Sequence, residues 1–174
     1  MFASLKVFLA NVVGDGGREP QANNRDGWLM TAALLTRVAT VHSEMSEGRR
    51  EVLDAILRSK FGLDDHMTAR LLEEAAAANR DAIDIYQFIR KLNEILDDDG
   101  RHQIVRMLGE VVYADGPVNE FETNIIWRAA DLLGVTSRQR VELRQRVLAG
   151  RAALTQTAHN LLPHAAELAP AVPK

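Results

Sequence analysis

Apolar residues recur at spacings of three and four along most of this chain, which is the pattern of one buried face on an α-helix. Such stripes follow one another over residues 34–41, 52–61, 67–72, 83–96, 104–112, 121–133 and 141–148. No segment shows the strict alternation of a half-buried strand. The pattern predicts an all-α, single-domain bundle of about seven to eight helices. The short connections between stripes favour antiparallel neighbours.

Residues that favour helix ends separate these stripes. Side-chain oxygens that can cap a helix N-terminus precede several of them, and glycines that can adopt the left-handed conformation follow two of them. The predicted N-caps are Ser46, Asp64 or Asp65, Asn119 and Thr136, and the predicted glycine stops are Gly62 and Gly134.

The chain divides into three parts. Residues 1–27 are predicted to be an N-terminal helix and a linker, because residues 14–27 are rich in Gly, Pro, Asn and Asp. Residues 28–150 form the helical domain, and residues 151–174 an Ala- and Pro-rich tail with one small docked helix and a disordered end. Within residues 1–13, Phe2, Leu5, Leu9 and Val12 share one helical face. That face either caps the bundle or contacts a partner or a membrane surface.

Two stretches of the chain resemble each other. When residues 34–64 are aligned with residues 107–136, the apolar positions coincide and Gly62 falls on Gly134 after one extra residue. Both copies read helix, tight turn, N-cap, helix and glycine stop. Because neither helical hairpin can bury its stripe alone, the repeat predicts a pseudo-twofold packing of two hairpins. Hydrophobic periodicity alone is the other explanation of this similarity.

Two acidic residues stand at a turn of the second copy. Asp115 ends the 104–112 stripe near a helix C-terminus, where the helix dipole disfavours a carboxylate, and Glu122 follows the N-cap Asn119 by three residues. The turn should therefore bring Asp115 and Glu122 together beside helix-end carbonyls. They are either helix caps only, or part of a Ca²⁺ or Mg²⁺ site. A site would need further acids, from Glu120 or from the 97–99 run, which otherwise reads as an N-terminal cap.

The same region carries a family resemblance. Ala-Asp-Gly, then Val-Asn-Glu-Phe-Glu, then an Ile-rich helix ending in Leu-Leu-Gly-Val resembles the signature of the tellurite-resistance TerB-like family, and the resemblance extends from Trp28 to Val147. It implies a helical bundle with a pseudo-repeat and an acidic site proposed to bind a metal. It also implies a link to tellurite resistance and envelope or stress responses, and no catalytic activity. Similar domains are fused to co-chaperones.

Asp115 and Glu122 match the acidic positions of that family, whereas the first copy departs from them. His42-Ser43 stands where Asp-Gly is expected, and Arg49 stands in the place of the matching Glu. His42 is either a hydrogen-bonded, half-buried side chain or a nitrogen ligand, which would favour a transition metal such as zinc over calcium. Arg49 could pair with an acid and replace a cation.

Composition narrows the remaining alternatives. The chain has no cysteine, which excludes disulfides, thiolate zinc sites and a cysteine nucleophile and fits a cytoplasmic protein. A formal net charge of −3 argues against nucleic-acid binding. No apolar run approaches the length of a membrane span, so membrane contact is expected only through residues 1–13. Trp127, Phe121 and Tyr113 are the candidate surface for a protein partner or a homodimer.

Three hypotheses remain. The first is a non-catalytic interaction domain with a divalent-cation site at Asp115 and Glu122, where calcium or magnesium is favoured over zinc. The second is a metal-free, co-chaperone-like adaptor in which the acids are only helix caps. The third is a hydrolase or small-molecule binder that uses the space between the two hairpins, although the histidines lack a Ser or acid at readable spacing.

Overall fold

All regular elements of the described structure are helices. The computed structural model describes residues 22–41, 44–116 and 118–161. Within them the elements are α2 (Ala22–Ala39), α3 (Glu47–Phe61), α4 (Asp65–Asp81), α5 (Tyr86–Ile95), α6 (Asp98–Val112), the 3-10 turn η1 (Tyr113–Asp115), α7 (Glu120–Leu132) and α8 (Ser137–Leu161). These residues contain no strand, which confirms the predicted all-α class.

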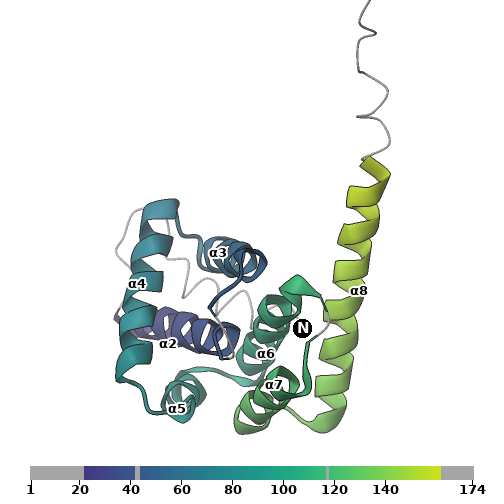
Figure 1. Cartoon of the computed structure of the whole chain (residues 1–174). Helices are drawn as coiled ribbons and strands as arrows, with labels where there is room; N and C mark the ends of the chain where they lie inside the picture. Colours follow the sequence, from purple (N-terminus) through teal and green to yellow (C-terminus); the bar gives the residue numbers. More distant parts are fainter. Residues whose placement is uncertain (1–21, 42–43, 117, 162–174) are drawn as a thin grey trace, which may run out of the picture.

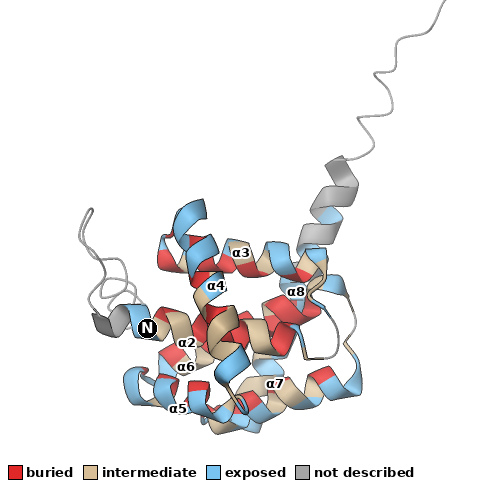
Figure 2. Cartoon of the chain, turned by 60° about the vertical axis from the view of Figure 1, so that its left-hand side comes forward, coloured by how far each residue is buried: buried red, intermediate tan, exposed pale blue. Residues whose placement is uncertain are grey.

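Two helices, α2 and α6, form the centre of the bundle. Helix α2 contacts α3, α4, α5, α6 and α7, while α6 contacts α2, α3, α7 and α8. Figure 1 shows α3, α4 and α5 grouped around α2, and α7 and α8 beside α6. Figure 2 shows the buried positions gathered on the inner faces of the helices. The largest fully buried side chains include Leu34 and Leu35 of α2 and Ile104 and Leu108 of α6.

The helix ends follow the capping residues of the sequence. Ser46, Asp64, Asp97 and Asn119 each accept the backbone N–H three residues ahead, at Arg49, Met67, Gly100 and Glu122 respectively. Gly62 and Gly134 have positive φ of 65° and 76°, as a left-handed stop requires. The predicted N-caps and glycine stops are therefore confirmed. The internal duplication itself stays a prediction.

Two helix boundaries differ from those predicted. Helix α2 begins at Ala22, inside the predicted linker, because Arg25 pairs with Glu74 of α4 and Trp28 stacks on Phe61 of α3. These contacts outweigh the poor helix propensity of the Asn, Asp and Gly residues there. Helix α8 runs from Ser137 to Leu161, so the small helix predicted within the tail is part of α8 and not a separate element. The domain boundary at residue 150 stays a prediction. Residues 1–21 and 162–174 lie outside the described residues.

The stripe over residues 83–96 is confirmed at Ile89, Leu92 and Leu96 but not at its beginning. Ile83 is 93% exposed, and Tyr86 is exposed at the start of α5. The side chains that enter the core are Phe88, Ile89 and Leu92. The turn at residues 82–85 lies outside any helix, so Ile83 does not continue the helical face that periodicity assigned to it.

Substituting two members of that stripe should therefore have very different effects. Leu92→Ala removes a fully buried side chain and should lower the free energy of unfolding by about 2–5 kcal/mol. Ile83→Ala should change it by no more than about 0.5 kcal/mol, because its side chain is already in water. Urea unfolding of both variants measures the difference, and similar losses would contradict this packing.

Candidate functional site

One arginine lies where four helix ends meet. Arg49 belongs to the first turn of α3, directly after its N-cap Ser46, and is buried, with 8% of its surface exposed. The first turn of α3 packs against η1, which follows the C-terminus of α6. A charged side chain is rarely buried unless it is paired and hydrogen-bonded. The contacts of the Arg49 guanidinium therefore define the site.

The guanidinium first binds the C-terminal ends of the two central helices. Its Nη1 donates to the carbonyl of Ala39, the last residue of α2, at 3.1 Å. Its Nη2 donates to the carbonyl of Val112, the last residue of α6, at 3.4 Å. The last carbonyls of a helix have no partner within the helix and carry its negative dipole end. A single cation thus binds one terminal carbonyl of each of the two helices.

The same guanidinium pairs with both predicted acids. Its Nη2 lies 2.6 Å from Glu122 Oε1, and its Nε lies 3.2 Å from Asp115 Oδ2. The Glu122 contact is a hydrogen bond between two buried side chains. The Asp115 contact is an ion pair without an aligned hydrogen bond, because Arg49 Nε has no hydrogen-bond partner. The two acids therefore contact neighbouring nitrogens of one guanidinium.

Each carboxylate has a further partner. Ser46 Oγ donates to Asp115 Oδ2 at 2.6 Å, so the cap of α3 is tied to the end of the second hairpin. Glu122 Oε2 accepts the backbone N–H of Asn119 at 3.2 Å and completes a capping box on α7. Glu122 is therefore a cap, as predicted, and at the same time the buried counter-ion of Arg49.

The two ion pairs contribute differently to the free energy of unfolding. Glu122 is 6% exposed, so removing its buried partner would leave an uncompensated charge, at a cost of about 3–5 kcal/mol. The Asp115 side chain is 40% exposed, so solvent screens its attraction to Arg49. The Arg49–Glu122 pair is the part of the site on which the structure depends most.

Gly48 allows Asp115 to approach α3. A Cβ atom at position 48 would stand 2.6 Å from Asp115 Oδ1, closer than any unstrained contact. An alanine there would push the carboxylate away from Ser46 and Arg49. The absence of a side chain at Gly48 therefore permits this close approach, which sequence reasoning did not identify.

The other predicted ligands do not join this cluster. Glu120 is exposed in the first turn of α7, and Asp97 caps α6 through a hydrogen bond from Gly100 N of 2.8 Å. His42 lies outside the described residues. In the part of the chain that is described, no group of three or more His, Cys, Asp or Glu side chains is arranged to hold a metal ion. Arg49 already contacts Asp115 and Glu122, so a divalent cation at these acids would have to share their oxygens with the guanidinium. Metal binding stays a prediction.

The three predicted partner-binding aromatic residues are in different environments. Tyr113 is buried, so it takes no part in an exposed surface. Trp127 is half-buried beneath Arg140 of α8, whose guanidinium carbon lies 5.8 Å from the ring centre and whose Nη1 donates to the Trp127 carbonyl. Phe121 is 54% exposed. A partner contact at Phe121 stays a prediction.

The Gly48–Asp115 contact can be measured by a double-mutant cycle. Gly48→Ala should be more favourable, by about 1–2 kcal/mol, in an Asp115→Ala background than in the unmodified chain, because the steric conflict is then absent. The gain in helix propensity, up to about 1 kcal/mol, is common to both backgrounds and cancels. Urea unfolding gives the free energies.

Gly150→Ala is the matched control, since a Cβ at this glycine of α8 meets nothing within 4 Å and should act equally in both backgrounds. Additive effects of Gly48→Ala and Asp115→Ala would show that the close approach has no energetic consequence.

Comparison with known proteins shows the family to which this chain belongs. Within the described residues, no helix combines the length and the hydrophobicity needed to span a membrane. Comparisons with curated proteins and with solved structures returned no match. A family model described as tellurite resistance protein TerB matches residues 29–145, which include both hairpins and the whole Arg49 cluster. The chain therefore belongs to the TerB family of tellurite resistance proteins.

Proposed function

We propose that this chain is a non-catalytic, cytoplasmic interaction domain of a tellurite-resistance or related stress-response system, and that it needs no divalent cation. The observation that carries the proposal is Arg49, whose guanidinium contacts both Asp115 and Glu122 and so bridges the two hairpins. The family match supports the link to tellurite resistance. The lack of cysteine agrees with a reducing compartment.

The contacts of the site support a role for the Arg49 guanidinium as the cation that neutralises the two acids, here called the internal cation. A bound metal would have to share carboxylate oxygens with a guanidinium that already contacts them at 2.6 and 3.2 Å, and like charges at that distance repel. Arg49 also binds the carbonyls of Ala39 and Val112, which are oxygen atoms that a calcium ion could otherwise use. Arg49 thus contacts both the carboxylate oxygens and the carbonyl oxygens that a metal ion would use.

The same contacts support a role without catalysis. A general base needs a carboxylate that can take a proton from a substrate. Glu122 is buried and engaged by Arg49 and by the backbone of Asn119, while Asp115 is engaged by Arg49 and Ser46. Neither acid is free for that step, and the acids serve instead to hold the two hairpins in one arrangement.

Thermal unfolding with and without cations tests the internal cation. The melting temperature of the unmodified chain should change by less than about 1 °C between a chelator and millimolar Ca²⁺, Mg²⁺, Mn²⁺ or Zn²⁺. Arg49→Glu should place three acids together, lower the melting temperature in chelator by more than about 5 °C, and recover part of the loss when a cation is added. Arg50→Glu, the same charge change at an exposed neighbour, is the control.

A saturable rise in the melting temperature of the unmodified chain that Asp115→Asn abolishes would contradict the proposal and support the cation-dependent alternative. This measurement compares the unmodified chain with Asp115→Asn, so it still tests the proposal if Arg49→Glu does not fold.

The tellurite link is tested in the native host. A strain that lacks this chain should tolerate several-fold less tellurite in growth assays, and the unmodified chain should restore tolerance. The Arg49→Glu variant should restore less than the Arg50→Glu control, because the hairpins are no longer held together. Equal tolerance of the deletion strain and its parent would remove tellurite from the proposed function and leave the structural role of Arg49 untouched.

A further inference from the structure

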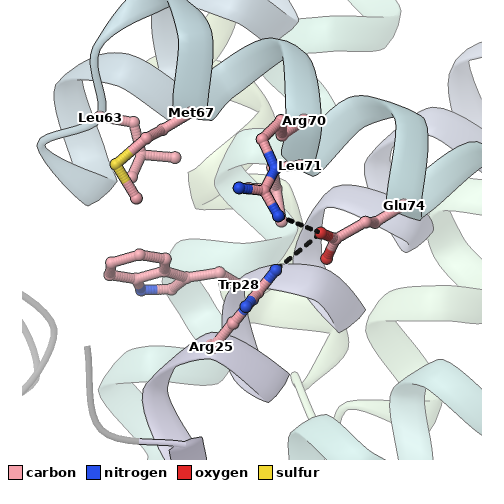
Figure 3. Close-up of a pocket in the computed structure, with 7 residues that line it drawn as sticks. All are labelled: Arg25, Trp28, Leu63, Met67, Arg70, Leu71 and Glu74. Atoms are coloured by element: carbon pink, nitrogen blue, oxygen red, sulfur yellow. Dashed lines mark hydrogen bonds and ion pairs between the residues drawn. The ribbon is translucent and has the colours of Figure 1, made fainter. Parts of the chain in front are cut away.

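A second feature, remote from Arg49, is a groove between α2 and α4. It has a volume of about 150 Å³ and is drawn in Figure 3. Its apolar lining is Trp28 of α2, Leu63 of the α3–α4 connection, and Met67 and Leu71 of α4. Arg25, Arg70 and Glu74 form a polar rim along one side. The groove therefore offers a small apolar surface beside the beginning of α2.

The apolar surface of the groove is incompletely covered. Met67 is 44% exposed, whereas Leu71 of the same helix is buried. Trp28 stacks on Phe61 at 5.5 Å and is 5% exposed, yet its Nε1–H has no hydrogen-bond partner among the described residues. The indole is thus already covered, and the exposed apolar side chain of the groove is Met67. A complementary occupant would bring apolar side chains against Met67.

The rim adds a preference for a negative or carbonyl-bearing group. Arg25 and Arg70 both face Glu74, at 2.7 and 3.8 Å, so two guanidinium groups share one carboxylate. Their side chains are 55% and 61% exposed and can reach an added partner. The C-terminal end of a helix is such a group, since its last carbonyls lack partners and carry the negative dipole end.

A segment of the chain itself has the matching chemistry. Residues 1–13 carry Phe2, Leu5, Leu9 and Val12 on one predicted helical face and a single charged residue, Lys6. Residues 14–21 join this segment to α2 and span at most about 29 Å when extended. Because α2 begins at Ala22, the groove residues Arg25 and Trp28 lie in its first two turns. Such a short tether gives an effective concentration in the millimolar range.

We propose that residues 1–13 dock as a helix in the groove formed by Trp28, Leu63, Met67 and Leu71. The apolar face of the segment covers Met67. The unpartnered carbonyls at the end of the segment accept hydrogen bonds from Arg25. This proposal is independent of the proposed function, since it involves neither Arg49 nor a cation.

Disulfide trapping tests the docking, because the full chain contains no cysteine. Leu9→Cys combined with Met67→Cys should form an intramolecular disulfide under mild oxidation, since the two Cβ atoms must approach within about 4.5 Å. Leu5→Cys and Val12→Cys are scanned in the same way. The readout is the rate of cross-linking, followed by gel mobility and mass.

Ile95→Cys, paired with the same residues of the segment, is the matched control. Ile95 is 47% exposed, close to the value for Met67, and it lies next to the start of α2, where its Cδ1 would be 3.0 Å from a Cβ added at Gly27. It does not line the groove. At least one groove pair should cross-link about tenfold faster than its control pair.

Equal rates for the Met67 and Ile95 pairs at all three positions would overturn the proposal. Disulfides formed between two molecules rather than within one would overturn it as well, and would point to a second copy as the occupant. Because the altered residues at positions 67 and 95 are already exposed, loss of folding is not expected to obscure the result.

Discussion

The arrangement of this molecule depends on one buried cation, the guanidinium of Arg49. It is the point at which the C-termini of α2 and α6, the first turn of α3 and the capping box of α7 meet. Two helix C-termini and two carboxylates directed toward one place would repel one another without a positive charge between them. Arg49 supplies that charge from within the chain, with planar donors that contact several oxygens simultaneously.

The position of the Arg49 guanidinium also accounts for the residue types at several neighbouring positions. Gly48 has no side chain because Asp115 approaches α3 closely at that position. Ser46 both begins α3 and donates to Asp115, so the start of the first hairpin is tied to the end of the second. Glu122 shares its two oxygens between Arg49 and the backbone of Asn119. A set of helix caps thereby becomes a bridge between hairpins.

The resemblance implies a metal ion at acidic residues, whereas in this chain the matching acids contact an arginine. Both a metal ion and a guanidinium supply positive charge. Where the resemblance leads one to expect an acid, the first hairpin carries Arg49, and the structure places it against the two acids that match the family. An internal guanidinium can neutralise the same carboxylates that a cation would neutralise elsewhere, without dependence on the cation concentration. In this TerB chain the two hairpins are therefore held together by an arginine side chain, which is always present, and not by an ion that can dissociate.

The sequence by itself determined the helical class, the caps, the glycine stops and the proximity of Asp115 and Glu122, because these follow from local periodicity and from one short turn. It also indicated, from its place in the repeat, that Arg49 could pair with an acid. Only the tertiary structure decided that both acids share this arginine, that Ile83 is exposed, and that α2 begins within the predicted linker. Those outcomes depend on contacts between helices far apart in the chain, and local spacing carries no information about such contacts.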